Sequence, residues 1–155
     1  PCLAATTFTG QNIGAKKYDR VKTGIIQGMT LSAIYTGVVS VVLYTFGGTI
    51  LKIFSSDLDV IQFGQEAIRI IAPFYLTMTV HQIIMGTLRG ARKTVVTMLI
   101  GVGNMCILRM IYINFLVPFF PSYHAVVLCY PITWITTMLM DSLYCWKAKW
   151  LPKTE

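Results

Sequence analysis

Four long apolar runs divide the chain, and short polar or basic turns separate them. The runs cover residues 24–46, 58–88, 95–117 and 123–146. A membrane-spanning helix needs about 20 mostly apolar residues, and each run reaches that length. Because backbone polar groups in lipid must be satisfied within the segment, we expect helices rather than strands. The pattern predicts an all-α, polytopic transmembrane helical bundle with four full spans.

The segment before the first run, residues 1–15, is too short to cross a bilayer and reads as the tail of a preceding helix. The chain begins at Pro1 without an initiator Met, and no basic region followed by an apolar region marks a signal peptide. We therefore expect the chain to be a fragment of a longer protein.

Turn and capping residues predict where the spans begin, end and bend. Gly47-Gly48 predicts the end of the first span. Ser56 and Asp59 resemble a capping box that opens the second span. Pro73 and Pro131 should kink the second and fourth spans, because proline removes a helical hydrogen bond.

Composition excludes other classes of protein. Charged residues make up 12% of the chain and hydrophobic residues 55%, whereas a soluble domain has about 25% charged residues. The net charge of +7 does not indicate a nucleic-acid partner, because the basic residues form short clusters between apolar runs. The cysteines lack Cys-x-x-Cys spacing, so we expect no disulfide and no metal site. The expected surrounding partner is membrane lipid.

Basic residues gather on one side of the predicted spans. The turns at 15–23 and 89–93, together with the C-terminal tail, hold ten Lys and Arg residues, and the opposite side holds only Lys52. Basic loops remain in the cytoplasm during membrane insertion. The distribution predicts a multi-pass protein of the cell membrane with a cytoplasmic C-terminus.

Polar side chains inside the spans are candidates for a transport pathway, because an ionisable group in a bilayer is costly. His81 either carries a proton or is a neutral histidine satisfied inside the bundle. Arg109, in the outer half of the third span, either anchors the helix or lines a pathway. Asp141 is near the inner end of the fourth span, so it should not pair with Arg109. The candidates for the pathway are Tyr75, His81, Gln82, Asn104 and Arg109.

Motifs of enzymes are missing from the sequence. We find no Gly-x-Ser-x-Gly, no His-Glu-x-x-His, no phosphate-binding loop and no paired carboxylates within a span. We expect no enzymatic activity and no cofactor.

Five blocks of the sequence resemble the multidrug and toxic compound extrusion (MATE) transporters, in matching order and spacing. The blocks are Thr7–Arg20, Ile50–Asp57, Arg69–Tyr75, Leu88–Thr94 and Tyr130–Trp134. Within them, the residues that match family motifs are Gln11, Asn12, Gly14, Arg89 and Gly90. These motifs match the family's eighth helix and the loop after its tenth helix.

The resemblance implies a twelve-helix fold with two six-helix lobes around a central cavity. This chain looks like the end of helix eight and helices nine to twelve, so the N-terminal lobe is missing. The family exchanges cationic or amphipathic drug-like molecules for sodium or protons by alternating access. One branch has an acidic residue in helix ten, but Thr77–Thr79 holds no carboxylate here. In the other branch the coupling carboxylate lies in the N-terminal lobe, which is absent, so the coupling ion stays open. Lys93 also replaces an acid that is common in the following loop, so the resemblance assigns no role to that position.

Two alternatives to a drug antiporter remain open. One is a lipid-linked glycan flippase of the same superfamily, although a pyrophosphate site needs several cations and only Arg69 and Arg109 fall within spans. The other is a non-transporting four-helix membrane module that acts as a scaffold or assembly partner.

Overall fold

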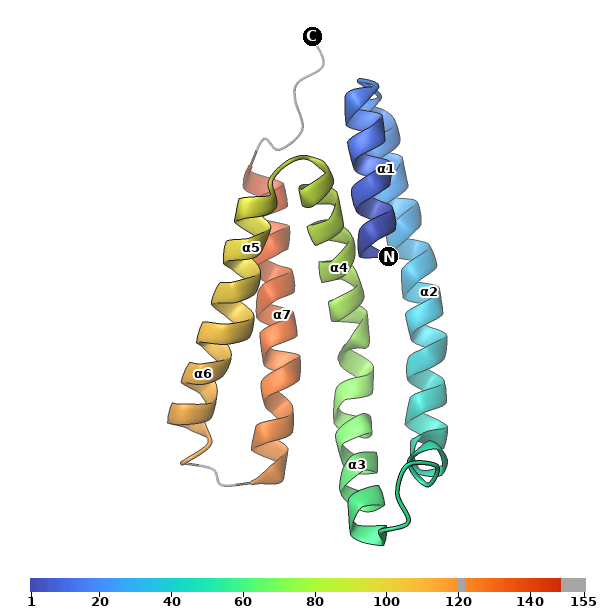
Figure 1. Cartoon of the computed structure of the whole chain (residues 1–155), viewed down its shortest axis with the longest axis vertical. Helices are drawn as coiled ribbons and strands as arrows, with labels where there is room; N and C mark the ends of the chain where they lie inside the picture. Colours follow the sequence, from blue (N-terminus) through green and yellow to red (C-terminus); the bar gives the residue numbers. More distant parts are fainter. Residues whose placement is uncertain (120–121, 149–155) are drawn as a thin grey trace.

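The computed structural model describes residues 1–119 and 122–148, and the chain in these ranges is helical without strands (Figure 1). The elements are α1 (Cys2–Gly14), α2 (Tyr18–Leu51), α3 (Leu58–Ile71), η1 (Ala72–Phe74), α4 (Tyr75–Gly90), α5 (Thr94–Val102), η2 (Gly103–Leu108), α6 (Arg109–Ile111), η3 (Tyr112–Leu116) and α7 (Tyr123–Lys147). Four stretches are long and apolar enough to cross a membrane, namely Tyr18–Leu51, Leu58–Gly90, Thr94–Leu116 and Tyr123–Lys147. The predicted all-α bundle with four spans is confirmed.

The end of α2 differs from the prediction. The helix continues through Gly47 to Leu51. A Cβ atom on Gly47 would lie 3.2 Å from the Ile68 side chain of α3, and one on Gly48 would lie 2.8 Å from the Gln65 side chain. These glycines therefore permit close packing of α3 on α2, and they do not stop the helix.

The start of α3 also differs in detail. Asp57, rather than Ser56, is the N-cap residue, and its carboxylate accepts a hydrogen bond from the N–H of Asp59 at 2.9 Å. A side-chain oxygen at this position satisfies one of the free N–H groups of the first turn. The helix begins at the predicted place with a neighbouring residue as its cap.

The predicted bends take different forms. Pro73 lies in the one-turn 3-10 helix η1, which joins α3 to α4, whereas Pro131 lies inside the continuous helix α7. The third span changes winding without a proline, because η2 and η3 are π-helical. Single π-helical turns within α-helices frequently occur at functional sites.

The connections alternate between the two ends of the bundle (Figure 1). The α1–α2 turn, the α4–α5 turn and the end of α7 lie at one end, and the α2–α3 connection lies at the other. The basic residues of the first end therefore share one side, as the charge pattern predicts, and the cytoplasmic assignment of this side stays a prediction. Lys149 and Lys153, which we included in that pattern, lie outside the described residues.

Both basic turns end their helices in the same way. The N–H of Lys17 donates to the carbonyl of Asn12 at 2.8 Å, and the N–H of Lys93 donates to the carbonyl of Leu88 at 2.9 Å. Such a bond across five residues is typical of a Schellman motif, which usually places glycine in a left-handed conformation. Here lysine and arginine take the position of that glycine.

Glycine at these two positions should stabilise the protein. Lys16 and Arg92 have φ angles of 57° and 62°, which cost an L-residue roughly 1–2 kcal/mol. Lys16→Gly and Arg92→Gly should each raise the free energy of unfolding by up to about 1 kcal/mol, because part of the gain is lost to unfolded-state entropy. Thermal unfolding in detergent micelles measures the change. Lys17→Gly and Lys93→Gly are matched controls with negative φ, and a similar gain there would contradict this account.

Helix α4 is the best buried element, because α1, α2 and α7 all pack against it. Its contact with α1 is close. The hydroxyl of Thr6 donates to the carbonyl of Gly86 at 3.0 Å, and a Cβ atom on Gly90 would lie 2.5 Å from the carbonyl oxygen of Thr6. Small residues at Gly86 and Gly90 thus allow the backbones of α1 and α4 to approach closely. Gly14, in contrast, has open space around it.

Candidate functional site

A seam of side chains joins the α3–α4 helix to α7 along most of its length. The two helices run in the same direction (Figure 1), and partners along the seam are about 60 residues apart in sequence. From the α2–α3 end, the partners are Phe63 and Tyr123, Glu66 and His124, Tyr75 and Trp134, and His81 and Asp141. Two of these four contacts join a histidine to a carboxylate.

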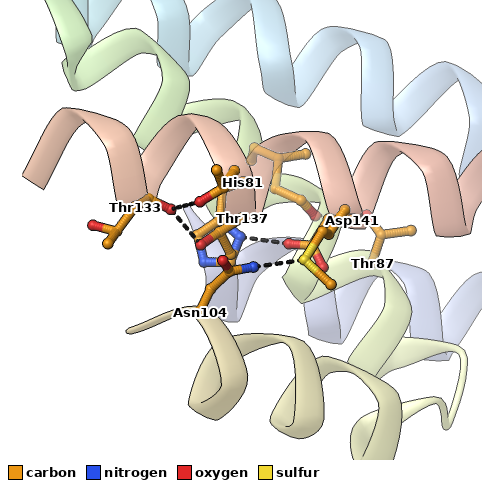
Figure 2. Close-up of polar contacts among 9 residues, drawn as sticks. His81, Thr87, Asn104, Thr133, Thr137 and Asp141 are labelled. Atoms are coloured by element: carbon orange, nitrogen blue, oxygen red, sulfur yellow. Dashed lines mark hydrogen bonds and ion pairs between the residues drawn. The ribbon is translucent and has the colours of Figure 1, made fainter. Parts of the chain in front are cut away.

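The seam contact nearest to the basic turns is a buried pair of ionisable groups, His81 and Asp141. The Nδ1 atom of His81 lies 2.5 Å from Oδ2 of Asp141. His81 is 4% exposed and Asp141 is 1% exposed. The two side chains point toward one another across the α4–α7 interface (Figure 2). The imidazole and the carboxylate are therefore in direct hydrogen-bond contact, and a bond between these two groups is charge-assisted when either is ionised.

The second carboxylate oxygen of Asp141 is a buried polar atom without a partner. Oδ1 makes no hydrogen bond to the described residues. The hydroxyl of Thr137, one helical turn before Asp141, donates instead to the backbone carbonyl of Thr133 at 2.6 Å. The carboxylate therefore holds one strong partner and one free acceptor.

Both members of the pair lie within the membrane-spanning part of their helices. His81 is eight residues before Arg89, and Asp141 is six residues before Lys147. At a helical rise of 1.5 Å per residue, these separations are about 12 Å and about 9 Å. The basic residues mark the end of each span, so both groups lie at a similar depth on the basic side of the hydrocarbon core.

The third span supplies two further candidate residues. Asn104 packs beside the pair and donates from Nδ2 to the sulfur of Met140 at 2.7 Å (Figure 2). Arg109 donates to the hydroxyl of Thr133 at 3.3 Å, and its guanidinium lies 4.6 Å from the centre of the Tyr130 ring. Arg109 thus has neutral partners near the middle of α7 and, as expected, does not pair with Asp141.

Tyr75 and Gln82 lie on another side of α4. Both line a groove of about 330 Å³ against α2, which also includes Tyr35 and Thr36. The Tyr75 ring stacks on Trp134, with ring centres 5.6 Å apart. The five predicted pathway residues therefore do not form one site. His81, Asn104 and Arg109 face α7, Gln82 faces α2, and Tyr75 contacts both.

The family-motif residues surround the two basic turns and contain no reactive arrangement. Gln11 and Arg89 are exposed, and the side chain of Asn12 donates to the carbonyl of Phe8 at 2.8 Å. Gly90 packs on α1. Their geometry sets the shape of the turns and the contact between α1 and α4.

Sequence reasoning missed the partner of His81. Asp141 is the only carboxylate in the fourth span, and its distance from the basic end of that span matches that of His81. This shared depth is the signal that would have indicated the pair. At the opposite end of the seam, Glu66 lies 3.5 Å from His124. Arg69 is three residues after Glu66 on the same helix, a spacing that allows an ion pair, but within the described ranges Glu66 forms no ion pair with it.

Metal binding has no support in the described part of the chain. No group of three or more His, Cys, Asp or Glu residues occurs there at metal-binding separation. The buried pair supplies one carboxylate and one imidazole. Its chemistry is therefore proton binding or charge recognition.

Comparisons with known proteins identify relatives. The family model MatE matches residues 2–116. A probable multidrug resistance protein, YoeA of Bacillus subtilis, is 32% identical over 89 residues, which are 57% of this chain and 19% of that protein. The probable multidrug resistance protein NorM of Thermotoga maritima is 29% identical over 98 residues, 63% of this chain and 21% of that protein. YpnP of Bacillus subtilis, named in the same way, is 28% identical over 113 residues, 70% of this chain and 25% of that protein. The chain spans about a fifth of the length of the first two relatives.

Proposed function

The chain belongs to the MatE family, and from that premise we propose that it forms the last part of the C-terminal lobe of a multidrug efflux transporter. In this proposal α1 is the end of helix eight, and the four spans are helices nine to twelve of a twelve-helix protein. An N-terminal lobe completes the central cavity. The transporter exchanges organic cations or amphipathic drugs for sodium or protons.

The buried pair of His81 and Asp141 is the observation that supports a transport function over a purely structural one. Ionisable groups are rare in membrane interiors and mark ion pathways and proton relays. A scaffold of four helices has no need of them, since neutral contacts already join its helices. The hydroxyls of Thr36 and Thr79, for example, lie 2.8 Å apart between α2 and α4.

An apolar groove on the bundle supports the proposed class of substrate. It has a volume of about 350 Å³ and is lined by α1, α2 and α4, including Phe8, Ile25 and Ile83. Drug-sized ligands bind in clefts of this size with mostly apolar walls. We propose that this surface contributes part of the wall of the drug cavity.

A resistance assay tests the proposed function. Expression of the full-length protein in a bacterial strain without its own efflux pumps should raise the concentration of ethidium needed to stop growth. The control is the same protein with a substitution that unfolds it. The amount of each protein in the membrane is measured as well. Unchanged sensitivity, at a normal level of folded protein, would contradict efflux.

A thermal-shift assay distinguishes the flippase alternative. Ethidium should raise the unfolding temperature of the full-length protein, and a polyanionic lipid-linked pyrophosphate should not. The physical reason is that a pyrophosphate site needs several cations, whereas only Arg69 and Arg109 fall within the spans, and Arg109 already contacts Tyr130 and Thr133. Stabilisation by the polyanion alone would favour the flippase.

A further inference from the structure

We propose that the pair of His81 and Asp141 is a proton-binding site, which takes one proton from water and returns it to water during the transport cycle. This inference rests on the proposed transport function, and it assigns the coupling ion and the residues that hold it. With a neutral imidazole and an ionised carboxylate, the pair carries one negative charge. After a proton moves from hydronium to His81, leaving water, the pair is an imidazolium and a carboxylate with no net charge.

Burial of the pair is costly. Two ionisable groups are almost fully enclosed and lie well inside the span, where a charge is expensive. Replacement of a buried ion pair by apolar residues is often neutral or stabilising, so such a pair is weak support for a structural role. A group that must change its charge requires an imidazole or a carboxylate, and this site has one of each.

The carboxylate of Asp141 is incompletely hydrogen-bonded. Its Oδ2 atom is 2.5 Å from Nδ1 of His81, whereas Oδ1 is buried and unpartnered. A pair selected only to hold two helices would be expected to satisfy both oxygens. Thr137 is one helical turn before Asp141, and its hydroxyl donates to the backbone. Oδ1 of Asp141 is therefore free to accept a hydrogen bond or a proton when the pair takes up a proton.

The bonding around Asp141 favours a proton over sodium. A hard cation requires several oxygen ligands at once. Oδ2 of Asp141 is bonded to His81, and among the described residues no group hydrogen-bonds to Oδ1. Sodium would need further oxygens, such as the lone pairs of the Thr137 hydroxyl or the side-chain oxygen of Asn104, to converge on Oδ1. A proton needs only the groups already present.

The surrounding charges leave the pair isolated. On α7, Cys145 lies one turn after Asp141 and near enough to interact with it. On α1, Cys2 packs at Gly86, beyond the first turn after His81. Helix α2 carries its charged residues only at its start, and α5 carries none. From the third span, Arg109 contacts Thr133, which is about 12 Å along α7 from Asp141. The described part of the chain places no other charged group against the pair.

The helices that hold the pair can bend at matched positions. Pro73 is eight residues before His81, and Pro131 is ten residues before Asp141. The two helices are parallel, so both prolines lie at a similar level on the outer side of the pair. Proline weakens the helical hydrogen bonds at each level. The segments that carry His81 and Asp141 can therefore change their separation when the charge of the pair changes.

Nuclear magnetic resonance of labelled histidine tests proton binding without any transport assay. The chain has two histidines, His81 and His124, so His124→Asn leaves one histidine signal from this segment. The purified protein in lipid nanodiscs is titrated from about pH 5 to about pH 9, a range on both sides of neutral pH. We expect the His81 ring signal to pass between its neutral and protonated positions. Sodium chloride, compared with choline chloride at equal ionic strength, should not move this signal.

Two results of the titration would overturn the proposal. One is a His81 signal that keeps a single protonation state over the whole range. The other is a sodium-dependent shift of the His81 signal, which would show sodium in the site. These readouts need only folded protein, so they decide the proton site even if the transport function fails.

Ion-driven flux tests whether this proton is coupled to transport. In proteoliposomes of the full-length protein, a pH gradient should drive ethidium exchange, and a sodium gradient should not replace it. His81→Gln and Asp141→Asn should each lower the pH-driven flux by about a hundredfold, the loss typical of a removed proton-transfer group. His124→Asn, at the exposed outer pair, is the matched control and should retain the flux. Full pH-driven flux in both the His81 and the Asp141 variants would exclude coupling through the pair.

Discussion

Replacing His81 with leucine should lower the free energy of unfolding by about 3–5 kcal/mol. The substitution leaves Asp141, which is 1% exposed, without its partner inside an apolar interface. Asp141→Leu should cause a smaller loss of about 1–3 kcal/mol, because the imidazole that it leaves buried and unpaired is neutral. Unfolding of the protein in detergent, followed by circular dichroism with increasing denaturant, measures each loss.

The double variant identifies the cause of these losses. His81→Leu combined with Asp141→Leu removes both polar groups, so its stability should return close to that of the wild type. His124→Leu is the surface control, since the His124 and Glu66 side chains are 58% and 40% exposed. Its effect should be about 0–1 kcal/mol, as for other exposed pairs. Additive losses in the double variant would show that the pair does not interact.

Replacing Gly86 with leucine should separate α1 from α4. Even the Cβ atom would lie 2.4 Å from the backbone oxygen of Cys2, and a backbone atom cannot move aside without shifting the whole helix. Gly86→Ala should lower the free energy of unfolding by about 1–3 kcal/mol, as overpacking does in other cores, and Gly86→Leu should lower it further. The thermal midpoint of unfolding in micelles measures the change.

Glycines elsewhere in the same bundle provide matched controls. A Cβ atom on Gly37 or Gly101 would meet nothing within 4 Å. Alanine at either position should raise the stability by up to about 1 kcal/mol, because glycine is a poor helix former. A gain at Gly86 like the gain at Gly37 would contradict the close packing of α1 on α4.

Much of the fold follows from the sequence because lipid allows few solutions. An apolar run of about 20 residues has to be a helix, so the number and type of the spans could be predicted. The ends of the helices were less certain. The local pattern of Gly47-Gly48 predicts a helix end, but both glycines lie within α2. Ile68 and Gln65 of α3 pack against them, so the glycines provide space for α3. The difference depends on a neighbour that no local pattern shows.

The candidate site was harder to predict than the spans. His81 could be selected because it is ionisable and lies inside an apolar run. Its contact with Asp141 depends on which helices are neighbours, on their parallel direction and on the rotation of each helix about its axis. None of these quantities is present in the periodicity of either segment alone. Gln82, the next residue along α4, faces α2 instead. A shift of one position along the helix therefore changes which neighbouring helix a side chain contacts.

The function proposed for this segment is that of part of an antiporter for organic cations. The most direct test is ethidium flux through proteoliposomes that contain the purified full-length protein and an imposed gradient of protons or sodium. The account predicts that ethidium moves against the flow of the coupling ion, and that an ionophore which removes the gradient stops this movement. Folded, correctly inserted protein that moves no ethidium under either gradient would contradict the claim.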